Sequence, residues 1–168
     1  MSTQVTVHRM VTTTTTSAFL INVGYLKTFP GILKIFQIIL GCVAVGIIGH
    51  YIHWSQRSDS LVPELFFLLI ATACLITTSL LLFSCICSIA TASIIPKTLF
   101  VVLLHGTLSY LLVCSSINLL REVVSRNEGY KIYEKGYSSK IFSGALGLVN
   151  CALYILSSIY SVRTFRRG

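Results

Sequence analysis

Few side chains in this 168-residue chain could do chemistry, and most of them stand within apolar sequence. His50 and His53 are three residues apart, a spacing that places two imidazoles near one face of a helix. Two histidines without a third ligand make a weak metal site, so we expect no bound metal. His105 lies well inside an apolar run, where an ionisable group is costly and is therefore a candidate for function.

The cysteines also lie within apolar sequence, which is typical of small packed thiols rather than of a disulfide framework. The six are Cys42, Cys74, Cys85, Cys87, Cys114 and Cys151. Cys85 and Cys87 stand near one end of an apolar run and are candidates for S-palmitoylation. No hydroxyl or thiol has a general base at a spacing that could activate it as a nucleophile. We therefore expect that the protein is not an enzyme and binds no cofactor.

Long apolar segments hold all of these residues in place. Hydrophobic residues make up 54% of the chain and charged residues 11%. A bilayer core of about 30 Å needs roughly 20 apolar residues of helix, and four segments are long enough. The sequence therefore predicts an all-α membrane protein, a four-helix bundle with spans at about 35–54, 65–88, 99–120 and 141–160.

The segments outside the spans are short. Residues 1–23 are rich in threonine and are expected to form a disordered cytosolic tail, because they offer little apolar surface to offset the entropy of ordering. Residues 24–162 form the four-span domain, and 163–168 form a basic cytosolic tail. Thr28 can cap the first helix with Pro30 in its first turn, and Pro63 with Glu64 is typical of the start of the second.

The formal charge of +8 comes from basic residues at the ends of the apolar runs. This placement indicates contact with anionic lipid headgroups rather than with nucleic acid. The expected headgroup contacts are Lys27, Lys34, Arg163, Arg166 and Arg167.

The orientation follows from the first span, which has two lysines before it and only Arg57 close behind it. The positive-inside bias then places both termini in the cytosol. Counted over every flank the rule is balanced at six basic residues a side, and we resolve the tie with the first helix. Arg121 and Lys140 stand at helix ends, from which they can reach either interface.

Small and polar residues recur at helical spacing on two spans. On the first span, Gln37 and Gly41 continue the face of Lys34, and Cys42 with Gly46 makes a second close-approach face. On the fourth span, Ser143, Gly147 and Cys151 are four residues apart. Such stripes let helices pack closely in lipid. Gln37 and His105 lie at similar depth and are expected to pair by a hydrogen bond.

The segment Gly-Tyr-Leu-Lys-Thr-x-Pro-Gly-x-Leu-Lys-x-x-Gln at residues 24–37 resembles the start of a MARVEL domain. It is most similar to the chemokine-like-factor branch and to the MAL and plasmolipin proteins. The resemblance implies a four-helix bundle with both termini cytosolic. It also implies a role in organising membranes, vesicle trafficking or cell junctions, or in escorting other membrane proteins, and it supplies no catalytic residues.

We therefore expect a protein of the plasma membrane or of endosomal or Golgi vesicles that acts through lateral helix contacts. Its expected partners are the lipid bilayer, other membrane proteins and a second copy of the chain. A small channel or transporter, or an accessory subunit of one, is the alternative. A pore needs a polar lining from several helices, and the spans offer only Gln37, His105 and scattered hydroxyls for it.

Overall fold

The structure is a computed structural model that describes residues 22–54, 61–128 and 135–167. Most of the predicted threonine-rich tail (1–23) lies outside the described residues. The described elements are η1 (Val23–Lys27), α1 (Phe29–Trp54), α2 (Val62–Cys87), α3 (Ile89–Ile94), η3 (Ile95–Lys97), α4 (Leu99–Asn127) and α5 (Tyr137–Arg167).

Four of these helices, α1, α2, α4 and α5, are long and apolar enough to cross a membrane. The predicted all-α, four-span fold is thus confirmed. Several helices extend beyond the apolar segments. Their ends would lie at the depth of the lipid headgroups, where polar residues are tolerated. In particular, α5 continues to Arg167, so residues 163–167 are helical, and their place in the cytosol stays a prediction.

Local sequence explains where the helices begin. The amide of Gly31 donates to Thr28 Oγ1 at 3.3 Å, which confirms the predicted cap of α1. Pro30 and Pro63 stand in first turns, where a missing N–H costs little. Ser88 is extended and ends α2, and its hydroxyl accepts from the Thr91 amide at 3.2 Å to start α3. The short α3 was not predicted by the sequence pattern.

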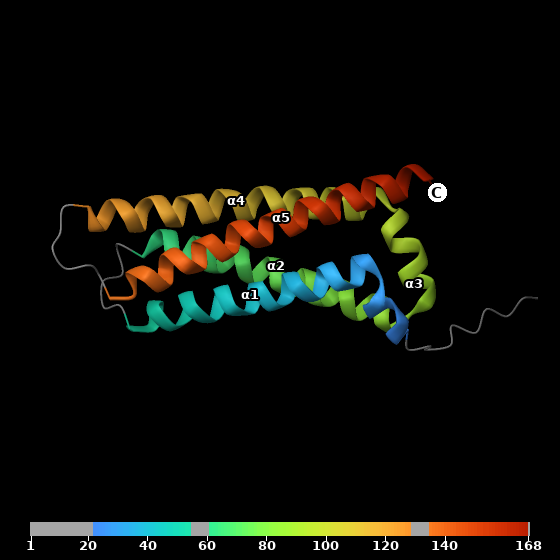
Figure 1. The fold of residues 1–168 in the computed structure, drawn as a ribbon, viewed down its shortest axis with the longest axis horizontal. Helices are drawn as coiled ribbons and strands as arrows, with labels where there is room; N and C mark the ends of the chain where they lie inside the picture. The colour runs from blue at the N-terminus through green and yellow to red at the C-terminus, as the bar shows by residue number, and fades with distance from the viewer. Residues whose placement is uncertain (1–21, 55–60, 129–134, 168) are drawn as a thin grey trace, which may run out of the picture.

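The four long helices run alongside one another, and α3 lies across one end of the bundle (Figure 1). We call this the α3 end. It also holds η1 and the C-terminal end of α5 (Figure 1). At the other end, called the far end, α1 and α4 finish and α2 and α5 begin. Neighbouring helices pack in the cyclic order α1, α2, α4, α5.

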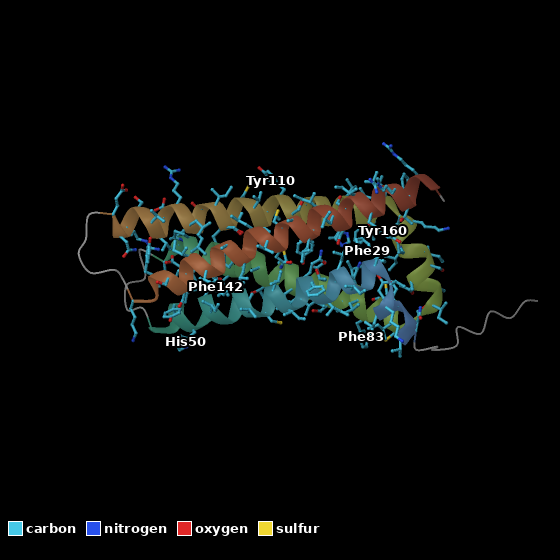
Figure 2. The ribbon with its side chains drawn as sticks, in the orientation of Figure 1. Phe29, His50, Phe83, Tyr110, Phe142 and Tyr160 are labelled. Atoms are coloured by element: carbon cyan, nitrogen blue, oxygen red, sulfur yellow. The ribbon has the colours of Figure 1, made fainter. Side chains whose placement is uncertain are left out.

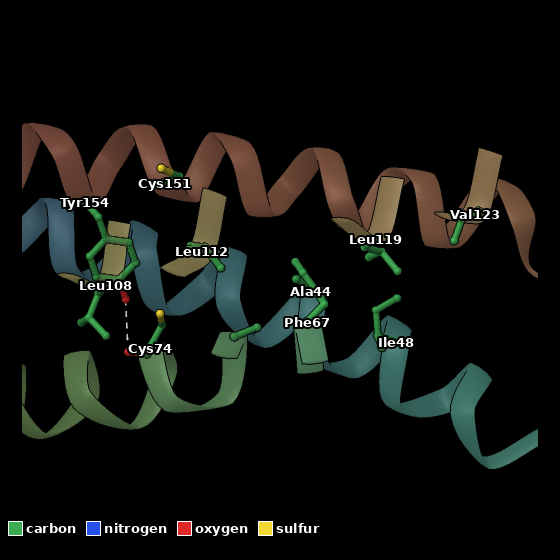
Figure 3. Packing of buried hydrophobic residues seen from close by; sticks show 11 residues of the cluster. Ala44, Ile48, Phe67, Cys74, Leu108, Leu112, Leu119, Val123, Cys151 and Tyr154 are labelled. Atoms are coloured by element: carbon green, nitrogen blue, oxygen red, sulfur yellow. Dashed lines mark hydrogen bonds between the residues drawn. The ribbon is translucent and has the colours of Figure 1, made fainter. Parts of the chain in front are cut away.

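The interior is closed by large side chains from all four helices (Figure 3). Ile48, Phe67 and Leu119 are fully buried, and Tyr154 is 1% exposed. The Tyr154 hydroxyl crosses the bundle to donate to the carbonyl oxygen of Cys74 at 3.1 Å (Figure 3). The core is therefore packed along its length, with a polar contact between α5 and α2.

The outer surface is apolar instead of polar. Phe83 and Tyr110 are 64% and 67% exposed, and both project from the bundle in Figure 2. With the other large apolar side chains exposed along the long helices, they form a more extensive apolar surface than water-soluble proteins usually have. The exposed coat fits a lipid environment, where apolar surface needs no cover.

Gly147 packs closely against side chains of the neighbouring helices. A Cβ atom there would lie 2.7 Å from the Phe67 ring and would also overlap Ser116. We expect Gly147→Ala to lower the free energy of unfolding by about 1–3 kcal/mol through overpacking, measured by thermal unfolding in detergent. Gly46→Ala is the matched control, because a Cβ at Gly46 meets no atom within 4 Å. Equal stability of the two variants would contradict this packing.

Candidate functional site

A polar seam joins α1 to α5 through the middle of the bundle. Gln37 Nε2 donates to Ser157 Oγ at 2.9 Å, and Asn150 Nδ2 donates to the Gln37 carbonyl oxygen at 3.2 Å. Ser143 Oγ donates to the Ala44 carbonyl oxygen at 3.0 Å. These bonds satisfy polar groups that lipid cannot, so they specify how α1 and α5 pack.

The predicted small-residue positions separate into inward and outward ones. Gly41 is buried and faces Leu75 and Asn150. Cys151 Sγ contacts the Ser109 carbonyl oxygen at 3.3 Å, while Ser143 and Gly147 pack as described above. Cys42 and Gly46, by contrast, are exposed on the outside of α1. The second face of α1 is therefore not used within this bundle.

His105 bonds within its own helix. Its Nδ1 lies 2.8 Å from the Val101 carbonyl oxygen, which can only accept, so Nδ1 carries the proton. Nε2 is then an acceptor, and it has no hydrogen-bond partner among the described residues. Gln37 Oε1 has none either. The predicted hydrogen bond between Gln37 and His105 is not formed, because each side chain bonds to a different group.

A charge cluster ties three helices at the far end. Glu64, at the start of α2, is fully buried and accepts hydrogen bonds from Arg126 of α4 and Lys140 of α5. The Lys140 Nζ to Glu64 Oε1 distance is 3.0 Å. Lys140 is 4% exposed, so it is held inside the bundle rather than extended to an interface as predicted. Removing one partner from such a cluster would leave a buried charge unpaired.

Glu64 does not stand out in the sequence, because it precedes the predicted second span and is typical of a helix start. The sequence feature that could have indicated the cluster is an acidic residue at the end of one span together with basic residues at the ends of two other spans. Sequence alone does not say that these three ends meet.

A cleft opens at the α3 end among η1, α1, α2, η3, α4 and α5. Its enclosed volume is about 10 Å³, which is room for one water-sized group. Its polar lining residues are Tyr25, Lys34, Cys85, Ser157, Tyr160 and Ser161. Lys34, which was predicted to contact headgroups, faces this cleft and is 7% exposed. No described carboxylate pairs with it.

The remaining predicted residues lie around the α3 end. Lys27, Arg163 and Arg166 are exposed, and the side chain of Arg167 lies outside the described residues. Cys85 is 1% exposed and lines the cleft, so its thiol is poorly placed for acylation. Cys87 is partly exposed, and palmitoylation there stays a prediction.

Of the histidine pair that the sequence places at the end of α1, the structure describes the side chain of His50 alone. His50 is exposed, and its ring lies edge-on to Tyr51 with centroids 5.2 Å apart. The side chain of His53 is outside the described residues. Within the part of the chain that is described, no three histidine, cysteine, aspartate or glutamate side chains gather closely enough to hold a metal ion.

A family model for MARVEL, described as a membrane-associating domain, matches residues 25–160. The chain belongs to the MARVEL family. The matched residues include most of the four spans, the seam, the far-end charge cluster and all of the cleft lining except Ser161. No curated protein and no solved structure matches the chain. The match assigns a membrane-associating domain and leaves its finer role to be argued from the residues.

The Glu64 cluster gives a stability prediction. Glu64→Gln leaves Lys140 buried without its anion, and we expect it to lower the free energy of unfolding by about 3–5 kcal/mol, measured by thermal unfolding in detergent. Glu128→Gln, at an exposed position after α4, is the matched control. The double variant Glu64→Gln with Lys140→Met should recover part of the loss. Unchanged stability of Glu64→Gln would contradict a structural role for the cluster.

Proposed function

We propose that this MARVEL protein organises membrane domains or escorts other membrane proteins, in vesicle trafficking or at cell junctions, through lateral helix contacts. The observation that carries the proposal is the outward face of α1 at Cys42 and Gly46. A Cβ at Gly46 would meet no atom within 4 Å, so a helix from another molecule can approach the α1 backbone closely here. The partner is another membrane protein or a second copy of the chain.

The interior supports this proposal over a channel or transporter. Leu112, Leu119 and Phe67 are at most 1% exposed and fill the bundle axis. Several polar groups between helices bond to one another, as Gln37 Nε2 does to Ser157 Oγ. A solute would find no continuous polar lining along the described helices. We infer that the chain works by contact, without catalysis.

We further propose that the α3 end faces the cytosol. The chain has five acidic residues, Asp59, Glu64, Glu122, Glu128 and Glu134, and all lie near or between the far ends of the spans in sequence. The α3 end therefore carries basic residues without acids. Lys27, Arg163, Arg166 and Arg167 would contact the anionic lipids of the cytosolic leaflet.

The pattern at residues 24–37 supports placing the chain in the chemokine-like-factor, MAL and plasmolipin branch of the family. Residence in the plasma membrane or in endosomal or Golgi vesicles accords with that assignment, and so does the escort role. Proximity labelling from the C-terminal end of α5 would identify the neighbours. Labelled neighbours drawn only from a transport complex would favour the accessory-subunit alternative.

Gly46→Leu should weaken lateral association several-fold by filling the close-approach face, with the fold kept. Self-association is measured by energy transfer between labelled copies in vesicles, and partner contact by proximity labelling. Gly106→Leu is the matched control on α4, because a Cβ there also meets nothing within 4 Å. If both variants lose association equally, or neither does, the outward face of α1 is not the contact surface.

The orientation has its own test. An N-glycosylation acceptor inserted within residues 129–134 should be modified in the secretory pathway, because this segment follows α4 at the end opposite α3. An acceptor placed in residues 1–21 should stay bare. The measurement is a mass shift on gels that glycosidase removes. The reverse pattern would show that the orientation is inverted.

A further inference from the structure

Lys34 is a buried cation that no described residue neutralises. Its side chain is 7% exposed, and no described residue forms a hydrogen bond or ion pair with its ammonium. Burying an unpaired charge costs several kcal/mol. Where this bundle buries an anion, at Glu64, it supplies two cations. The contrast indicates that the partner of Lys34 is not among the described residues.

Two hydroxyl groups add to the donors in the cleft. Tyr25 is 5% exposed, and its hydroxyl has no oxygen or nitrogen partner among the described residues, although the Cys85 thiol lies beside it. The Ser157 oxygen accepts from Gln37 Nε2, so the Ser157 hydroxyl hydrogen remains to donate. No carboxylate lines the cleft. A donor set of this kind fits an oxyanion.

Tyr25 keeps its proton in this setting. Burial, with a contribution from the neighbouring Cys85 thiol, raises the pKa of Tyr25 above its ordinary value. The phenol is therefore a neutral hydrogen-bond donor at physiological pH. A neutral donor beside a cation suits a ligand with one negative charge.

The walls of the cleft are apolar, and its end of the bundle is cationic. Leu33, Leu81 and Val101 line it beside the polar groups. Lys27 and Lys97 are exposed on η1 and η3, next to it. The enclosed volume of about 10 Å³ admits one water-sized group, such as a single phosphate oxygen, and the rest of the ligand would lie outside it against the apolar wall. A ligand with a charged head and an apolar body matches both surfaces.

We propose that the cleft at the α3 end binds the phosphate of an anionic phospholipid, with Lys34 Nζ, Tyr25 Oη and Ser157 Oγ as donors. The lipid chains leave along the apolar wall toward the bilayer. This site goes beyond lateral helix contact, because it makes the protein sensitive to the lipid composition of its leaflet. The site also differs from the loose attraction that the exposed lysines exert on lipid headgroups, because the side chain of Lys34 is buried in the cleft.

The test uses the purified full chain in neutral detergent, with thermal unfolding measured as lipid is added. Dioleoyl phosphatidic acid should raise the melting temperature of the natural chain in a saturable way, and dioleoyl phosphatidylcholine should not. Lys34→Met should weaken the apparent affinity for phosphatidic acid at least tenfold. Tyr25→Phe, which removes one hydroxyl, should weaken it about threefold.

Lys34→Met also has a second signature that separates binding from misfolding. Because it removes a buried unpaired charge, the lipid-free variant should melt at the same temperature as the natural chain or higher. Lys27→Met is the matched control, since it removes an exposed lysine from the same end and should weaken the affinity far less than Lys34→Met does. Equal weakening by Lys27→Met, or full affinity in Lys34→Met, would overturn the proposal.

Two further ligands identify the source of the oxyanion. Inorganic phosphate and oleate, at the same concentrations as the lipid, should each give a smaller rise in melting temperature than phosphatidic acid. A rise from inorganic phosphate equal to that from the lipid would overturn the lipid assignment. A larger rise from oleate would overturn the phosphate assignment in favour of a carboxylate.

Discussion

Helices in lipid gain nothing by hiding apolar surface from one another, and this constraint shapes the whole bundle. Association has to come from close packing and from polar groups that find partners between helices. Gln37 with Ser157 does this for α1 and α5, and Tyr154 with the Cys74 carbonyl does it for α5 and α2. Glu64 joins α2, α4 and α5 at the far end. The apolar side chains of the coat are left for the bilayer.

The two ends of the bundle handle charge in opposite ways. At the far end, a buried carboxylate meets two cations from other helices, so the charges are satisfied within the fold. At the α3 end, Lys34 is buried with no counter-ion among the described residues, and it lines the same cleft as the unpartnered hydroxyl of Tyr25. The far end holds the helices together, and the α3 end carries the site that we propose for a lipid.

Much of the fold could be predicted from local sequence. The cap at Thr28, the proline in the first turn and the four apolar spans depend on neighbouring residues, and the structure agrees with them. The α3 segment and the extension of α5 to Arg167 lacked a strong local pattern. The Glu64 cluster was out of reach for another reason, since its members are 62 and 76 residues apart in sequence.

The sequence by itself determined that four helices cross a membrane and that small and polar residues line parts of them, because hydropathy and helical spacing are local properties. Tertiary structure decided which of those residues meet. Gly41 and Cys42 are adjacent in sequence, yet Gly41 faces Leu75 and Asn150 while Cys42 faces outward. The rotation of each helix about its axis depends on contacts between distant segments, and it placed Lys34, an expected surface residue, in the lining of a cleft at the α3 end.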